Sequence, residues 1–215
     1  MKKFLAAICA VLALTTTAGA VEVAAPSALL MEKETGAILY AKDEHAKLEP
    51  ASVTKVMTIL LTMEAVDSGV LSYDTMVTAS AHACSMGGSQ IWLKENEQMT
   101  VDEMLKAVCV VSANDCAVAL GEAISGSEEA FVALMNRKAG ELGMKHTHFA
   151  NCTGLTSPEH YSSAADLAVL LQAALNNETF RTVFTTGQYT SSVTAQHPNC
   201  LLYTSPSPRD AHESR

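Results

Sequence analysis

The chain has 215 residues, of which 48% are hydrophobic and 17% are charged, and its formal net charge is −9. This composition predicts a globular protein with a substantial core, built as one domain or as one domain with a subdomain. Proteins that bind nucleic acid usually carry a basic face, so the acidic balance argues against nucleic acid as a partner.

Residues 1–20 have the three parts of a secretory signal peptide. Lys2 and Lys3 supply a positive start, residues 4–14 an apolar core, and Ala18-Gly-Ala20 a small-residue cleavage site. The apolar core is too short to cross a bilayer as a permanent helix. The cleavage site also disfavours the alternative of an uncleaved anchor, so we expect secretion across the cytoplasmic membrane.

The mature chain opens with two β-prone runs, residues 27–31 and 37–40, on either side of a turn that ends in Gly36. This pattern predicts a β-hairpin. A polar loop then leads to a helix that should begin near Ser52, because apolar residues recur there at helical spacing. The helix should end near Gly69, since glycine suits a helix C-terminus.

The next part of the chain is mixed. Strands are predicted over residues 75–79 and 90–93, with a bend at Gly87-Gly88 between them. The Thr-x-x-Glu pattern at residues 100–103 fits a capping box, and the apolar spacing after it predicts a helix that runs to about Val111.

Three more helices are expected. The first covers residues 115–123, the second is capped by Ser127 and ends at Gly143, and the third is capped by Ser163. The third helix carries an apolar stripe that should be buried: Leu167, Leu170, Leu171 and Leu175.

The composition changes at Tyr203. Residues 203–215 have no apolar periodicity and cannot contribute to a core, so we expect a disordered and non-native tail. Residues 21–202 would then form the folded domain.

Ser52 and Lys55 stand three residues apart at the start of a predicted helix, so their side chains share one face. Pro50 favours a helix start at this point, because proline cannot continue a helix backwards. A neutral lysine can take the serine proton and create a nucleophile, provided that burial or another cation lowers the lysine pKa. Taken alone, the pattern also fits a helix-capping serine followed by a solvated lysine.

A second element favours the catalytic interpretation. Ser112-Ala-Asn114 lies at the joint between two predicted helices. Ser-x-x-Lys followed by Ser-x-Asn is the pattern of penicillin-recognising serine enzymes. On these motifs the chain resembles the low-molecular-weight penicillin-binding proteins that act as D-alanyl-D-alanine carboxypeptidases. The resemblance runs from about Ala28 to Leu202 and includes Gly87-Gly-Ser89, Val111-Ser-Ala-Asn-Asp115, Phe131-Val-Ala-Leu-Met-Asn136, Glu141-Leu-Gly-Met144, Asn151-Cys-Thr-Gly-Leu155 and His160-Tyr-Ser-Ser-Ala-Ala-Asp166.

This resemblance implies an α+β fold of the β-lactamase/transpeptidase-like type, in which an antiparallel sheet packs with helices beside a helical subdomain. It implies that Ser52 attacks the carbonyl of the penultimate D-alanine of a peptidoglycan stem peptide and forms an acyl-enzyme. Lys55 would be the base for Ser52, Ser112 would relay a proton to the leaving amine, and Asn114 would orient the lysine or bind a substrate amide. The partners would be stem peptides ending in D-Ala-D-Ala and, as covalent inhibitors, β-lactams, met in the periplasmic or cell-wall space.

The chain departs from the family in one respect. The family continues through a strand carrying Lys-Thr-Gly, which grips the terminal carboxylate of the substrate, and this sequence contains no Lys-Thr-Gly. We therefore expect a catalytic domain that lacks its C-terminal strands, with weak activity or none. Membrane association would require a C-terminal segment that is absent here.

Two rival functions remain at this stage. A class A β-lactamase would carry Ser-Asp-Asn and a deacylating glutamate, whereas this chain has Ala113 in the middle of its motif, and Gln172 in the segment closest to the glutamate pattern. The other rival is a non-catalytic module that binds penicillin or peptidoglycan. Turnover of penicillin and release of D-alanine separate these possibilities.

No cofactor and no metal site are expected. The closest histidine pair is His146 and His148, and the sequence has neither His-Glu-x-x-His nor paired Cys-x-x-Cys patterns. Removal of the signal leaves an odd number of cysteines, which cannot all pair within one chain, so small buried thiols are favoured. They are Cys84, Cys109, Cys116, Cys152 and Cys200.

Overall fold

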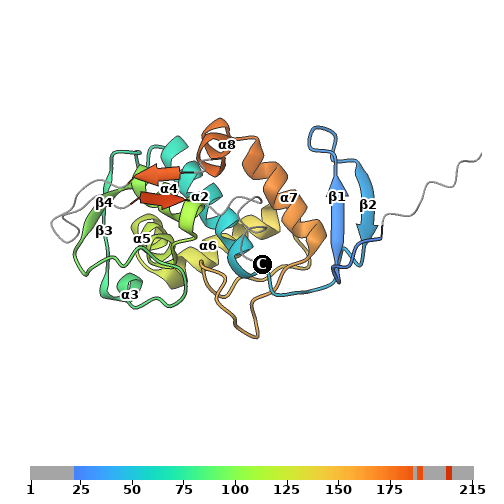
Figure 1. Ribbon diagram of the computed structural model, residues 1–215, viewed down its shortest axis with the longest axis horizontal. Helices are drawn as coiled ribbons and strands as arrows, with labels where there is room; N and C mark the ends of the chain where they lie inside the picture. Colours follow the sequence, from blue (N-terminus) through green and yellow to red (C-terminus); the bar gives the residue numbers. More distant parts are fainter. Residues whose placement is uncertain (1–21, 186–187, 191–201, 205–215) are drawn as a thin grey trace, which may run out of the picture.

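A computed structural model describes residues 22–185, 188–190 and 202–204. The predicted signal peptide and Cys200 lie outside the described residues. Within them the chain is α+β, with helices gathered around one long central helix and three two-stranded antiparallel sheets (Figure 1). None of the described helices is long and apolar enough to cross a membrane.

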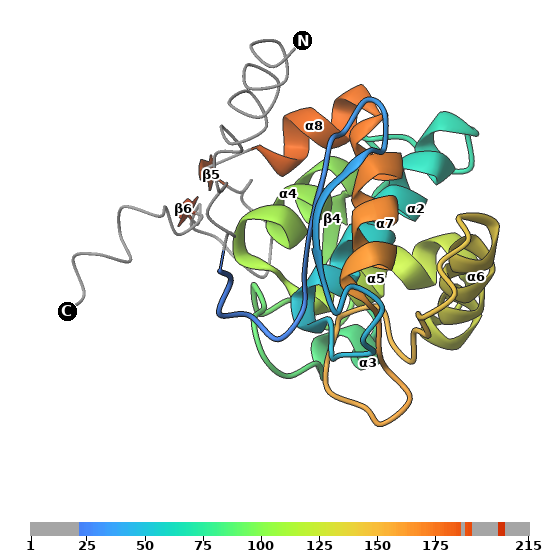
Figure 2. The same ribbon diagram turned by 90° about the vertical axis from the view of Figure 1, so that its right-hand side faces the viewer.

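The predicted hairpin is confirmed as strands β1 (Ala28–Met31) and β2 (Ile38–Lys42), which pair antiparallel. Its turn is stabilised locally, because the carboxylate of Glu32 accepts the backbone N–H groups of the two residues that follow Lys33. The hairpin lies along helix α7 (Ala164–Leu175) at one end of the molecule (Figure 1), and Figure 2 shows its strands running beside that helix.

The central helix α2 (Lys55–Asp67) follows a short 3-10 turn, η1 (Ala51–Thr54), which begins right after Pro50. Ten of its thirteen residues are buried, so the whole helix is enclosed rather than one apolar side of it. A helix with apolar residues all round belongs in the interior. Its two buried threonines satisfy their hydroxyls on backbone carbonyls, Thr62 within the helix and Thr58 on Cys152.

Strands β3 (Met76–Thr78) and β4 (Gln98–Thr100) pair beside the short helix α3 (Ala81–Cys84). Helix α4 (Val101–Val111) follows β4 directly and begins with the predicted capping box, in which Thr100 and Glu103 bond to each other's backbone N–H. Helix α5 (Asn114–Ser125) begins one residue earlier than predicted and packs against α2, α3, α4 and α6.

The strand predicted over residues 90–93 is wrong. The carboxylate of Asp115, at the start of α5, accepts the N–H groups of Ile91 and Leu93, so these amides are not available to a strand partner. Trp92 between them has a φ of +65°, which breaks an extended run. Strand β3 pairs with β4, which lies further along the chain.

Helix α6 (Glu128–Glu141) is capped by Ser127 as predicted, and Gly143 follows its end with a positive φ. Helix α7 is capped by Ser163, and of its leucine stripe Leu170 is fully buried whereas Leu171 is 36% exposed. Helix α8 (Glu178–Phe184) was not predicted. Asn177 caps it, and Phe180 and Val183 anchor it in the core.

The last described elements are the paired strands β5 (Gln188–Thr190) and β6 (Leu202–Thr204). The domain boundary predicted at Tyr203 falls inside β6, whose residues pair with β5. The remainder of the predicted tail, residues 205–215, lies outside the described residues.

Candidate active site

Ser52 and Lys55 are brought into contact as their spacing predicts. The Lys55 amine donates a hydrogen bond to the Ser52 hydroxyl over 3.2 Å. Ser52 is exposed in the 3-10 turn, whereas Lys55, the first residue of α2, is only 3% exposed. The pair thus spans the boundary between solvent and core, with the hydroxyl outside and the amine inside.

Burial changes the charge of the lysine. It lowers the pKa of Lys55 from an ordinary value of 10.5 to about 8, because the surrounding core disfavours the ammonium form. No carboxylate is bonded to the amine among the described residues, and its other bond is to the backbone carbonyl of Thr153, over 2.7 Å. A neutral lysine beside Ser52 is therefore accessible near neutral pH, so the alternative of a solvated lysine is wrong.

The carbonyl of Thr153 is held by a tight turn over residues 151–154. The side-chain oxygen of Asn151 accepts the N–H groups of Thr153 and Gly154, and Gly154 has a φ of +86°. A Cβ on Gly154 would run into the backbone carbonyl of Ala51, directly before the serine. The turn therefore packs tightly against the backbone next to Ser52, and its Thr153 carbonyl binds Lys55.

The backbone at the nucleophile is itself strained. Ala51 has a φ of +46°, an uncommon conformation for a residue with a side chain. Such strain persists only where surrounding structure imposes it, and it clusters at functional sites. The contact with Gly154 is one source of that constraint.

Ser112 and Asn114 lie at the joint between α4 and α5, as predicted. Ser112 is the C-cap residue of α4, and its backbone is in the left-handed conformation with a φ of 60°. The amide nitrogen of Asn114 donates to the carbonyl of Gly87 over 2.6 Å, and its backbone N–H donates to the carbonyl of Ser89. The segment around the two glycines thus wraps the start of α5.

Two polar atoms in this joint are buried without a partner. The hydroxyl of Ser112 and the side-chain oxygen of Asn114 have no hydrogen-bond partner in the described part of the chain. Buried polar groups are normally satisfied. Such unpaired groups are suited to bind a substrate amide and to pass on a proton.

Close contacts connect the two halves of the site. Gly88 lies against the side-chain amide of Asn114 on one side and against Leu155 on the other, and Leu155 follows the turn that touches Ala51. No direct hydrogen bond joins Ser112 or Asn114 to Ser52 or Lys55 among the described residues. The four predicted residues therefore share one neighbourhood but form two separate pairs.

His160 is buried next to the turn that carries Ser52. Its ring Nδ1 accepts the N–H of Ala150, so Nε2 carries the proton and donates to the Thr54 hydroxyl over 2.7 Å. Burial lowers the pKa of His160, which keeps the ring neutral. The histidine thereby supports the 3-10 turn that carries Ser52, through its hydrogen bond with Thr54.

An apolar cavity of about 480 Å³ opens beside the nucleophile. Among the described residues that line it, Ser52 carries the one hydroxyl, and the others are apolar: Leu29, Val53, Val56, Ala164, Leu167, Ala168, Leu171 and Phe184. These residues come from β1, η1, α2, α7 and α8. The serine therefore faces a broad apolar groove between the hairpin and the helices.

The described residues contain no cluster of three or more histidine, cysteine or acidic side chains arranged to hold a metal. The four described cysteines, Cys84, Cys109, Cys116 and Cys152, are free thiols. Gln172 donates to the backbone carbonyl of Lys33 and so joins α7 to the hairpin turn. Its likeness to a deacylating position in the sequence is a coincidence of pattern.

Sequence reasoning missed the supports of the lysine. The Thr153 carbonyl, the Asn151 side chain and the close approach of Gly154 are all tertiary contacts. One signal was available, because Asn-x-x-Gly at residues 151–154 is a turn pattern with a left-handed glycine.

Comparison with known proteins places this geometry in context. A protein-family model described as D-alanyl-D-alanine carboxypeptidase matches residues 14–206. The curated protein DacF of Bacillus subtilis, named as a D-alanyl-D-alanine carboxypeptidase, is 54% identical over 154 residues. DacD of Escherichia coli, with the same description, is 37% identical over 190 residues. The chain covers 40% and 49% of these two relatives, so it spans less than half of their length.

Solved structures agree with the sequence comparison. The D-alanyl-D-alanine carboxypeptidase DacD from Francisella tularensis has a TM-score of 0.78 at 34% identity, over 90% of this chain and 45% of that one. Penicillin binding protein 6B from Escherichia coli has a TM-score of 0.76 at 36% identity, over 83% of this chain and 58% of that one. The predicted β-lactamase/transpeptidase-like fold is confirmed.

Proposed function

The chain belongs to the D-alanyl-D-alanine carboxypeptidase family, and we propose that it acts as a serine carboxypeptidase that removes the terminal D-alanine from peptidoglycan stem peptides. The observation that carries the proposal is the contact between Ser52 and an enclosed lysine whose pKa is lowered to about 8. Activation of a hydroxyl nucleophile by an adjacent neutral amine is an established route to covalent acyl transfer.

The reaction begins with proton transfer from the Ser52 hydroxyl to the neutral Lys55 amine. The serine oxygen attacks the carbonyl of the penultimate D-alanine, and the tetrahedral intermediate places negative charge on the former carbonyl oxygen. The N–H of Ser52 lies in the first turn of a helix, where amides lack helical partners, and is available to this oxygen.

Collapse of the intermediate expels the terminal D-alanine. Its nitrogen needs a proton, which the Ser112 hydroxyl supplies and recovers from the Lys55 ammonium. The unpaired oxygen of Asn114 accepts the N–H of a substrate amide, which gives that buried atom the partner it lacks among the described residues. Water then attacks the acyl-enzyme at the same carbonyl, and Ser52 is released.

The proposed substrate indicates where the protein acts and which class of compound inhibits it. Peptidoglycan lies outside the cytoplasmic membrane, so the protein acts in the periplasmic or cell-wall space, in accord with the signal-like residues 1–20. A β-lactam presents a strained amide where the substrate carbonyl sits. It therefore acylates Ser52 and blocks the site.

The test is labelling with a penicillin, followed by intact-mass and peptide analysis, on the 215-residue chain and on the same chain continued with the C-terminal part of the Bacillus subtilis relative. One adduct at Ser52 is expected on the continued chain, with weak labelling or none on the 215-residue chain, and Ser52→Ala should abolish the adduct. Ser68→Ala, at the other end of α2, is the matched control and should label normally.

Turnover distinguishes the rival functions. Release of D-alanine from a D-Ala-D-Ala peptide, with a long-lived penicillin adduct, supports the carboxypeptidase. Rapid penicillin hydrolysis would indicate a β-lactamase instead. An adduct on any residue other than Ser52, or binding without an adduct, would refute the proposed site.

A further inference from the structure

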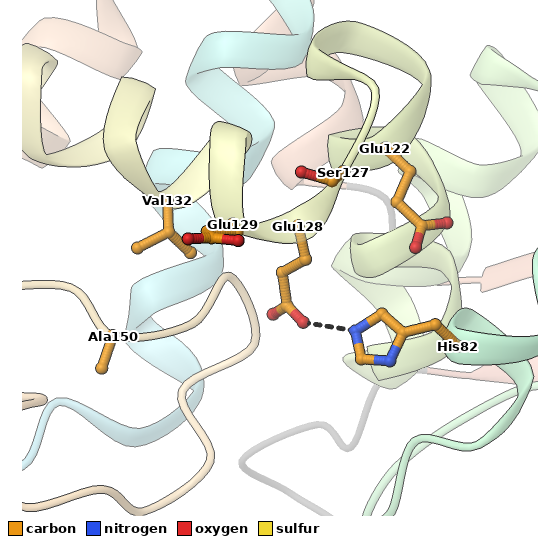
Figure 3. A pocket seen from close by; sticks show the side chains of 7 residues that line it. All are labelled: His82, Glu122, Ser127, Glu128, Glu129, Val132 and Ala150. Atoms are coloured by element: carbon orange, nitrogen blue, oxygen red, sulfur yellow. Dashed lines mark hydrogen bonds and ion pairs between the residues drawn. The ribbon is translucent and has the colours of Figure 1, made fainter.

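Glu128, the first residue of α6, makes two different contacts with its two carboxylate oxygens. One oxygen lies 2.7 Å from Nε2 of His82, as Figure 3 shows. The other accepts the backbone N–H of Cys152 over 3.2 Å and its thiol over 3.3 Å. Burial and the nearby carboxylate raise the pKa of Cys152, so its sulfur keeps the proton that this second bond requires.

Cys152, which Glu128 contacts, directly precedes Thr153, whose carbonyl binds the Lys55 amine. The carbonyl of Cys152 accepts the hydroxyl of Thr58 over 2.8 Å, and the next carbonyl, that of Thr153, accepts the Lys55 amine over 2.7 Å. Helix α2 therefore holds the two carbonyls from one side. Glu128 holds the N–H of the same stretch from the other side.

The His82 contact leads toward the other pair of site residues. His82 belongs to α3, which precedes the Gly87 carbonyl that receives the Asn114 side chain. The hydroxyl of Ser85 donates to the carbonyl of His82 and tightens this segment. Through His82 and Cys152, Glu128 thus forms a hydrogen-bonded connection between the segment that holds Asn114 and the turn that holds Lys55.

The surroundings of Glu128 show that it is not part of the dry core. Its side chain is 17% exposed, and it lines an open cavity of about 520 Å³ with His82, Glu122, Glu129 and the edge of α6 (Figure 3). Truncation of Glu128 would enlarge a space that water already reaches. We therefore expect Glu128 variants to fold, in contrast to variants of a buried core residue.

We propose that Glu128 is a positioning residue, which fixes the 151–154 turn and through the Thr153 carbonyl holds the Lys55 amine against Ser52. His82 orients the Glu128 carboxylate for this task. The inference rests on the proposed function, because it concerns the residue that serves as base for Ser52. It adds a residue of α6 to the set on which acylation depends.

If Glu128 acts by holding the turn, its loss should change the pKa of Lys55 in one direction; if it acts only through its charge, the change should be in the other direction. A carboxylate favours the protonated form of a nearby lysine, so removal of its charge alone would lower the pKa of Lys55. Loss of the turn would admit water to the amine and weaken the desolvation that lowers this pKa, so it would raise it. The sign of the change in the pH profile therefore distinguishes the two.

The experiment measures the second-order rate of acylation by a fluorescent penicillin between pH 6 and 10, together with the melting temperature. Glu128→Ala should lower the rate at pH 7.5 by about tenfold and move the midpoint of the profile upward by about one unit, because a buried N–H loses its acceptor. Glu128→Gln keeps an oxygen for that N–H and should stay within about twofold of the parent. Glu129→Ala, an exposed neighbour of equal charge, is the matched control and should change neither quantity.

An unchanged midpoint in Glu128→Ala, or a midpoint that moves downward, would overturn the proposal, as would equal effects of the Gln and Ala variants. A second measurement does not depend on acylation. Hydrogen exchange at the Cys152 amide should become faster in Glu128→Ala and stay unchanged in Glu129→Ala. The parent in these measurements is the chain continued with the C-terminal part of the Bacillus subtilis relative. If this parent is not acylated, the proposed function fails, and unchanged exchange would then also refute the link from Glu128 to the turn.

Discussion

Apolar side chains are buried at one end of the molecule and exposed at the other. Around α2, α4 and α5 the large side chains are fully enclosed, among them Met57, Met104 and Leu105. On the hairpin, Leu30, Ile38 and Leu39 are 56%, 59% and 64% exposed. Both regions are rich in apolar residues, but the first is enclosed by several helices, whereas the hairpin packs against α7 and leaves these three side chains exposed.

The nucleophile and its base sit at the junction of these regions. Ser52 lines the apolar groove together with Leu29 of the hairpin, whereas Lys55, one helical turn on, lies in the enclosed half. The difference explains how one short motif does two things. Its serine meets a ligand, and its lysine is kept from water so that the pKa is lowered.

The largest expected effect comes from Lys55→Arg. Arginine keeps the cation in the enclosed half but cannot supply a neutral base, since guanidinium does not lose its proton in proteins. The acylation rate should fall by about 10²–10⁴, the range of general-base catalysis. Lys145→Arg on the exposed surface is the control. A near-parental rate for the Lys55 variant would reduce the lysine to an electrostatic support.

The contrast in burial is tested by two leucines. Leu105→Ala removes a fully enclosed side chain and should lower the free energy of unfolding by about 2–5 kcal/mol. Leu39→Ala removes an exposed side chain and should change it by no more than about 0.5 kcal/mol. Urea unfolding measures both, and a large loss for Leu39→Ala would mean that the hairpin is covered in solution.

A pair of glycines tests the turn at the junction. Gly154→Ala places a side chain against the Ala51 carbonyl, at a residue whose backbone is in the left-handed conformation. The substitution should lower the free energy of unfolding by about 1–3 kcal/mol and should also lower the acylation rate. Gly140→Ala lies in α6 with no atom near the added carbon and should stabilise the chain by about 0.5–1 kcal/mol. Equal outcomes for the two variants would contradict the close contact at Ser52.

The smallest effects are those of pH. The acylation rate should rise with pH and level off above a midpoint of about 8, where Lys55 becomes neutral. His160 has a lowered pKa, so the stability that its neutral ring contributes is complete above its ordinary value of 6.5 and is lost as the pH falls below it. Thermal unfolding at pH 5 and pH 7.5 should show this loss, and His160→Gln should reduce the difference.

Local rules in the sequence determined much of this protein. The hairpin, the caps of Thr100, Ser127 and Ser163, and the positions of α2 and of α4 to α7 follow from spacing and from side chains that bond to nearby backbone. The contact between Ser52 and Lys55 also follows locally, because residues three apart at a helix start are neighbours.

Tertiary structure decided what depends on distant partners. Residues 90–93 match a strand pattern, yet the Asp115 carboxylate, more than twenty residues away in the chain, takes their amides. Lys55 gains its lowered pKa from a core assembled from several helices, and its second bond comes from the Thr153 carbonyl, 98 residues later. Periodicity records which face of a segment is apolar, but it carries no information about which distant group will meet that face.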